Sequence, residues 1–110
     1  MKEIRAIIRP QKLPRLREVL RSMPGFPGMT VSKAFGCGST VRHVPHNIKE
    51  ELVDFTEKVR VEIIAPDELV DALVDHIVQV ATTGQTGDGL VWVNDVERAV
   101  FIRKTMGPDN

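Results

Sequence analysis

The order in which two hydrophobic periods alternate along the chain constrains its fold more than any other feature. Apolar residues recur at every second position over residues 4–8 and 59–63, and Met29, Val31 and Phe35 keep the same spacing with Lys33 between the last two. Residues 90–93 are apolar throughout. These patterns are typical of strands. Between these segments, apolar residues recur at helical spacing over residues 13–23 and 67–81, as on the buried stripe of an amphipathic helix. The sequence therefore predicts two strand–helix–strand units in series.

Prolines mark the boundaries of these segments. Pro10 stops the first strand, Pro24 follows the first helix, and Pro66 precedes the second helix, as expected for a residue that lacks a backbone N–H. A further apolar run at Ala99–Ile102 predicts a short extra C-terminal strand. The resulting order predicts an α+β fold, the ferredoxin-like βαββαβ sandwich with a fifth strand.

Both helices are expected to cover one face of an antiparallel sheet. The opposite face is then a mixture that is too apolar for water and too polar for a core, represented by Ile7, Arg60, Glu62 and Ile64. We therefore expect that face to form an interface between subunits.

The chain of 110 residues predicts a single domain over residues 1–110, with a tail at about 105–110. Its 15 basic and 15 acidic residues cancel, which argues against nucleic acid as a partner. No apolar run is long enough for direct membrane insertion. The only cysteine, Cys37, excludes an internal disulfide, so we expect a cytoplasmic protein.

Residues 37–57 show no regular hydrophobic period, apart from a stretch at 47–55 that could form a short helix. So long an irregular stretch in a small domain is usually functional, and we expect it to be a mobile loop. Cys37, His43 and His46 lie in it. A thiolate and two imidazoles suit zinc or copper(I), and the alternative function is therefore a trimeric metal-binding or metal-sensing protein. The same residues also fit an exposed loop that binds no metal.

A glycine-rich segment, Thr82–Leu90, follows the second helix. Gly84, Gly87 and Gly89 can adopt positive φ and turn successive amide groups toward an anion. A simple helix C-cap and turn explain the same residues. The segment differs from a Walker A loop, and from a dinucleotide fingerprint, which opens a helix. No acid or cysteine has a partner recognisable from spacing, so the sequence does not predict an enzyme.

Several segments in one register resemble the PII signal-transduction (nitrogen regulatory protein P-II) family. They are Lys2–Pro10, Gly28–Val31, Phe35–Gly36, Val53–Phe55, Lys58–Ile63 and Thr83–Gly89. The resemblance implies a homotrimer with an adenine nucleotide (ADP, AMP or ATP) in each cleft between subunits. It also implies nitrogen regulation through residues 37–57, which would dock on a target protein such as a membrane transporter or a metabolic enzyme.

The resemblance also implies a set of site residues. Those around the base and sugar would be Thr30, Gly36, Ile64 and Thr83, and those of the phosphate cradle Gly84, Gly87, Asp88 and Gly89. Arg103 would bind phosphate from the last strand, and Lys58 matches a family lysine that contacts 2-oxoglutarate.

The chain departs from the family where charge is expected, and it resembles a divergent member. Leu90 replaces a lysine that binds phosphate, and Phe101 replaces an arginine. Cys37 and Gly38 replace an arginine and a glutamine that helps to hold magnesium. The chain has no tyrosine to be uridylylated. We therefore expect ADP or AMP to bind at least as well as ATP, unless Arg98, Lys104 or Arg9 of a neighbouring subunit supplies the missing charge.

Overall fold

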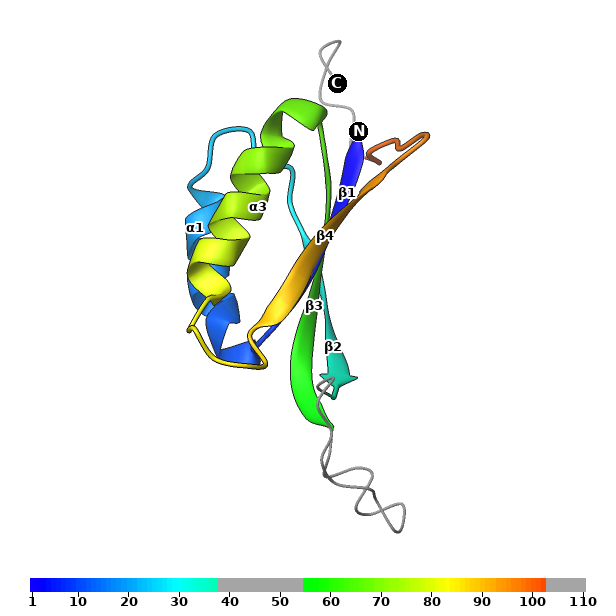
Figure 1. The fold of residues 1–110 in the computed structure, drawn as a ribbon. Coiled ribbons are helices and arrows are strands. Elements are labelled where there is room, and N and C mark those ends of the chain that lie inside the picture. The colour runs from blue at the N-terminus through cyan, green and yellow to red at the C-terminus, as the bar shows by residue number, and fades with distance from the viewer. Residues whose placement is uncertain (38–54, 103–110) are drawn as a thin grey trace.

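The computed structural model describes residues 1–37 and 55–102. Over these ranges the chain forms a four-stranded antiparallel sheet in the order β2-β3-β1-β4, with two helices on one face (Figure 1). The strands are β1 Lys2–Ile8, β2 Thr30–Gly36, β3 Thr56–Ala65 and β4 Gly89–Asp95; the helices are α1 Leu13–Arg21 and α3 Asp67–Ala81, and one 3-10 turn, η1 Pro10–Lys12, precedes α1. This arrangement confirms the predicted α+β fold with a βαββαβ order.

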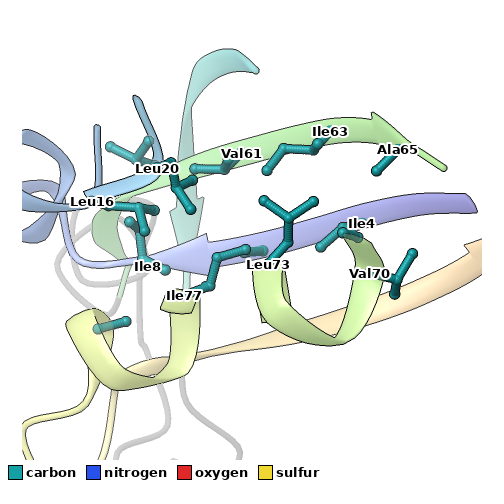
Figure 2. Close-up of a cluster of buried hydrophobic side chains, with 13 residues drawn as sticks. Ile4, Ile8, Leu16, Leu20, Val61, Ile63, Ala65, Val70, Leu73 and Ile77 are labelled. Atoms are coloured by element: carbon teal, nitrogen blue, oxygen red, sulfur yellow. The ribbon is translucent and has the colours of Figure 1, made fainter. Parts of the chain in front are cut away.

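The core lies between the two central strands and the helices (Figure 2). Register places Ile4 opposite Ile63, and Ala6 opposite Val61, on the face of the sheet that α1 and α3 cover. Each of these side chains is at most 1% exposed. The helices contribute the buried residues Leu16, Leu20, Val70, Leu73, Ile77 and Ala81. The periods in the sequence therefore identified the buried faces of β1, β3 and the two helices correctly, whereas Val31 and Phe35 of β2 are exposed.

The opposite face of the sheet, called the open face below, is not covered by any helix of the described ranges (Figure 1). Ile7 stands opposite Arg60 on one side and Leu90 on the other, and Arg5 stands between Glu62 and Trp92. This is the mixed apolar and charged surface that the sequence predicted. Its role as a subunit interface stays a prediction.

The predicted C-terminal strand is wrong for the single chain, because Ala99–Ile102 forms no strand. A backbone hydrogen bond of 3.2 Å from Val96 N–H to Met1 O anchors the chain just after β4. Beyond it Val100 is 71% exposed and Ile102 is fully exposed. The segment is apolar, but it pairs with no described strand of its own chain.

The predicted irregular stretch also ends earlier than expected, because β3 already begins at Thr56. Thr56 and Glu57 pair with Gly36 and Phe35 of β2, so backbone pairing continues where the side chains show no hydrophobic pattern. The helix expected at 47–55 and the tail at 105–110 lie outside the described residues, apart from Phe55, which is not helical. No helix within the described ranges is long and apolar enough to cross a membrane.

Candidate functional site

The segment that joins α3 to β4, residues 82–88, is called the glycine loop below. Thr82 leaves the helix in an extended conformation while its N–H still bonds to Val78 O at 3.0 Å. Gly84, Gly87 and Gly89 adopt φ values of 81°, 94° and 112°, in the region that side chains disfavour. The prediction that these glycines adopt positive φ is confirmed.

The surroundings of the three glycines differ. A Cβ at Gly89 would lie 1.7 Å from the carbonyl oxygen of Ile7, so the close approach of β4 to β1 excludes any side chain there. A Cβ at Gly84 would meet nothing within 4 Å. At Gly87 it would lie 3.2 Å from Arg9 Nη2 and 3.8 Å from Lys58 Nζ. Only Gly87 therefore faces cationic groups.

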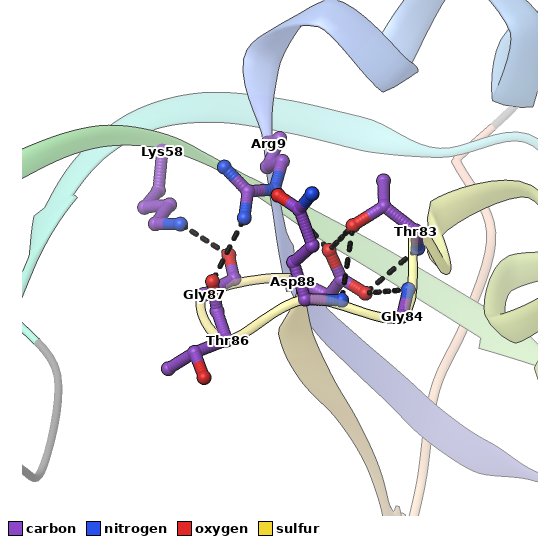
Figure 3. A network of polar contacts seen from close by, with 8 residues as sticks. Arg9, Lys58, Thr83, Gly84, Thr86, Gly87 and Asp88 are labelled. Carbon is purple, nitrogen blue, oxygen red and sulfur yellow. Dashed lines mark hydrogen bonds and ion pairs between the residues drawn. The ribbon is translucent and has the colours of Figure 1, made fainter.

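Asp88 organises the glycine loop from inside (Figure 3). Its carboxylate accepts hydrogen bonds from the backbone N–H groups of Thr83 at 2.7 Å and Gly84 at 3.1 Å, and from the Thr83 hydroxyl. Arg9 Nε adds an ion pair at 3.2 Å. These bonds, led by that of the Thr83 hydroxyl, hold the pKa of Asp88 well below its ordinary value. The carboxylate therefore accepts the hydrogen bonds of two backbone N–H groups that were expected to face phosphate.

Two cations of the same chain converge on the far side of the glycine loop (Figure 3). Arg9 Nη2 donates to Thr86 O at 2.9 Å, and Lys58 Nζ donates to Gly87 O at 2.5 Å. Lys58 is the third residue of β3 and is only 9% exposed. No acceptor among residues 1–37 and 55–102 engages the N–H groups of Thr86, Gly87 or Asp88. This end of the molecule can therefore receive an anion.

A second group of predicted residues lies at the other end of the sheet. Thr30 and Ile64 line an open depression of ≈450 Å³, together with Glu3, Pro27, Gly28, Met29, Glu62 and Phe101. Gly36 is not part of it, since it pairs with Thr56 at the opposite end of β2. Thr30 and Gly36 are six residues apart, and a strand rises roughly 3.3 Å per residue, so the two ends lie about 20 Å apart.

The metal alternative gains no support. Cys37 is exposed, and the part of the chain that the structure describes holds no cluster of three metal-ligating side chains. His43, His46 and Arg103 lie outside the described residues.

Comparison with known proteins shows the family. The family model described as nitrogen regulatory protein P-II matches residues 1–106. The chain is 45% identical to nitrogen regulatory protein P-II 1 of Escherichia coli strain K12, over 94% of this chain and 92% of that protein. It is 43% identical to the P-II protein of Haemophilus influenzae and 44% identical to that of Klebsiella oxytoca, with the same coverage. The chain belongs to the nitrogen regulatory protein P-II family. The expected regulatory role in signal transduction is therefore confirmed at the level of the family.

The P-II chain brings its predicted site residues together in two groups rather than one. Thr83, Gly84, Gly87 and Asp88 share the glycine loop with Lys58 nearby, and a Cβ at Gly36 would lie 3.7 Å from Lys58 Cγ. Thr30 and Ile64 form the other group. The assignment of these residues to a nucleotide stays a prediction.

Sequence reasoning missed that Arg9 of the same chain belongs to the glycine loop. It considered only Arg9 of a neighbouring subunit. The sequence does place Arg9 between the first strand and Pro10. This position fixes Arg9 at the end of β1. Its partners, Thr86 and Asp88, come from the other end of the sequence and were not predictable from spacing.

Proposed function

We propose that this P-II protein binds an adenine nucleotide in clefts between the subunits of a homotrimer, and that residues 37–57 dock on a target protein in response. Its regulatory class follows from the family. The nucleotide, the trimer and the docking segment are the finer steps of the proposal. Binding changes docking only if the nucleotide has unequal affinity for the two states of that segment.

The observation that carries the proposal is the separation of the two residue groups. The cations Arg9 and Lys58 contact the glycine loop, and the amide groups of that loop suit phosphate. The depression at Thr30 and Ile64 is lined by carboxylates and apolar groups and suits an uncharged base. Because the groups lie at opposite ends of one sheet, a compact site requires the depression of one subunit to meet the glycine loop of another.

The open face supplies a reason for subunits to meet. Ile7, Leu90 and Trp92 share it with Arg5, Arg60 and Glu62, and Leu90 is 60% exposed. Apolar side chains that are exposed on a sheet face gain by removal from water, at about 25 cal/mol per Å². Burial of this face between chains also brings each chain's sheet ends beside those of its neighbours.

The preference among nucleotides follows from charge. Arg9 and Lys58 remain beside Gly87, and Arg9 has N–H donors beyond those bonded to Asp88 and Thr86. Leu90 carries no charge, and Phe101 lies in the depression at the other end of the sheet. A charge-assisted hydrogen bond contributes about 1.5–3 kcal/mol, and each ~1.4 kcal/mol is tenfold in affinity. The loss of two such donors removes the advantage of ATP, so ADP or AMP binds at least as well.

Calorimetric titration with ATP, ADP and AMP, with and without magnesium, tests the proposal. Gly87→Ala should abolish binding, because the new methyl group enters the space beside Arg9 and Lys58. Gly25→Ala is the matched control and should retain binding, because Gly25 has a similar φ of 78° but lies outside the glycine loop and the depression. A monomer by light scattering at micromolar concentration, or a clear preference for ATP, would contradict the proposal.

A further inference from the structure

Phe101 stands where the family resemblance expects an arginine, and its surroundings are not those of a phosphate-binding group. It is 40% exposed and lines the depression together with Thr30, Met29 and Ile64. Among the described residues that line the depression, it is the only aromatic one. Its ring therefore provides a flat apolar surface at the end of the sheet that lies away from Arg9 and Lys58.

The charges of the depression select against phosphate. Of the lining residues that the structure describes, Glu3 and Glu62 are acidic and none is basic. Arg5 is close to both, with Nε 3.1 Å from Glu3 Oε1 and 3.8 Å from Glu62 Oε2. Two carboxylates against one guanidinium leave a negative balance, which disfavours an anion and favours an uncharged group with N–H donors.

We propose that Phe101 stacks on the adenine base of the nucleotide in this depression. The inference rests on the proposed function and adds a specificity-determining residue to it. An arginine at position 101 would contribute to phosphate binding, whereas phenylalanine contributes to base binding. The exchange keeps part of the affinity while making it independent of the number of phosphates.

Titration of wild-type protein and Phe101 variants with adenosine, AMP, ADP and ATP tests this stacking. Removal of a stacked aromatic ring lowers affinity by roughly tenfold or more per base. Phe101→Ala should therefore weaken all four ligands by a similar factor. Phe101→Trp should retain binding, and Phe101→Arg should weaken adenosine while raising the ratio of ATP to adenosine affinity.

Phe101→Leu separates stacking from apolar bulk, because it fills similar space without a ring. The inference predicts a loss for Phe101→Leu close to that for Phe101→Ala, with trimer size and circular dichroism unchanged. Full affinity in Phe101→Leu, or a loss confined to ADP and ATP, would overturn it. If wild-type protein binds none of the four ligands, the proposed function itself fails. If wild-type protein binds them and Phe101→Ala binds equally well, only the stacking is refuted.

Discussion

Substitution of alanine at each glycine near the glycine loop separates the demands of folding from those of binding. At Gly89 the new Cβ would lie 1.7 Å from the Ile7 carbonyl oxygen, far inside van der Waals contact, at a φ of 112°. The positive φ alone costs an alanine about 1–3 kcal/mol. Relief of the clash also requires β4 to move from β1, where Gly89 pairs with Ile8. We expect the unfolding free energy to fall by more than about 4 kcal/mol.

Gly84→Ala is the matched control, because its φ of 81° is unfavourable but its Cβ meets nothing within 4 Å. Its cost should be that of the backbone conformation alone, about 1–2 kcal/mol. Urea unfolding at one fixed protein concentration measures both variants, because assembly makes apparent stability depend on concentration. Similar losses for Gly84→Ala and Gly89→Ala would refute the claim that strand approach, rather than a ligand, requires Gly89.

Two further predictions concern the loop acid and the docking segment. The pKa of Asp88 is lowered by its bonds from Thr83, Arg9 and Gly84, so its stabilisation is complete above the ordinary value of 3.8 and is lost as pH falls toward the lower folded value. Urea midpoints between neutral pH and about pH 3 should therefore fall more for wild-type protein than for Asp88→Asn, and equal falls would contradict this. If nucleotide controls docking, ADP should change the rate of trypsin cleavage at Arg42 or Lys49 in wild-type protein and leave it unchanged in Gly87→Ala. An unchanged rate in both proteins would contradict the control of docking by nucleotide.

The sequence predicted those elements whose burial arises within the chain. The helix α3 begins at Asp67 and ends at Ala81 as expected, because its wide apolar face packs on its own sheet. The irregular start of β3 was missed, because Thr56 and Glu57 are held by backbone pairing with β2 and both are exposed. The apolar run Ala99–Ile102 misled the prediction, since no described strand of the same chain pairs with it.

In the candidate site, too, only the features that depend on neighbouring residues in the sequence were predictable. Positive φ at Gly84, Gly87 and Gly89 follows from composition and position in a turn. The specific reason for Gly89 does not, because it depends on the carbonyl group of Ile7 in the first strand. The engagement of Asp88 by Arg9 likewise joins opposite ends of the sequence. Local motifs thus predicted a loop suited to anions but could not distinguish internal partners from ligand-facing groups.

Mixing of two binding-defective subunits tests most directly whether each site is built from two chains. Ile64→Asp damages the depression, and Gly87→Ala damages the glycine loop, so neither trimer should bind ADP alone. If every cleft joins the depression of one subunit to the loop of another, co-refolding equal amounts restores roughly a quarter of the clefts. Calorimetry should then detect ADP binding at about that stoichiometry, and the double variant alone should bind none. Mixed trimers that bind no ADP at all, while wild-type trimers do, would place the site within one chain and contradict the account.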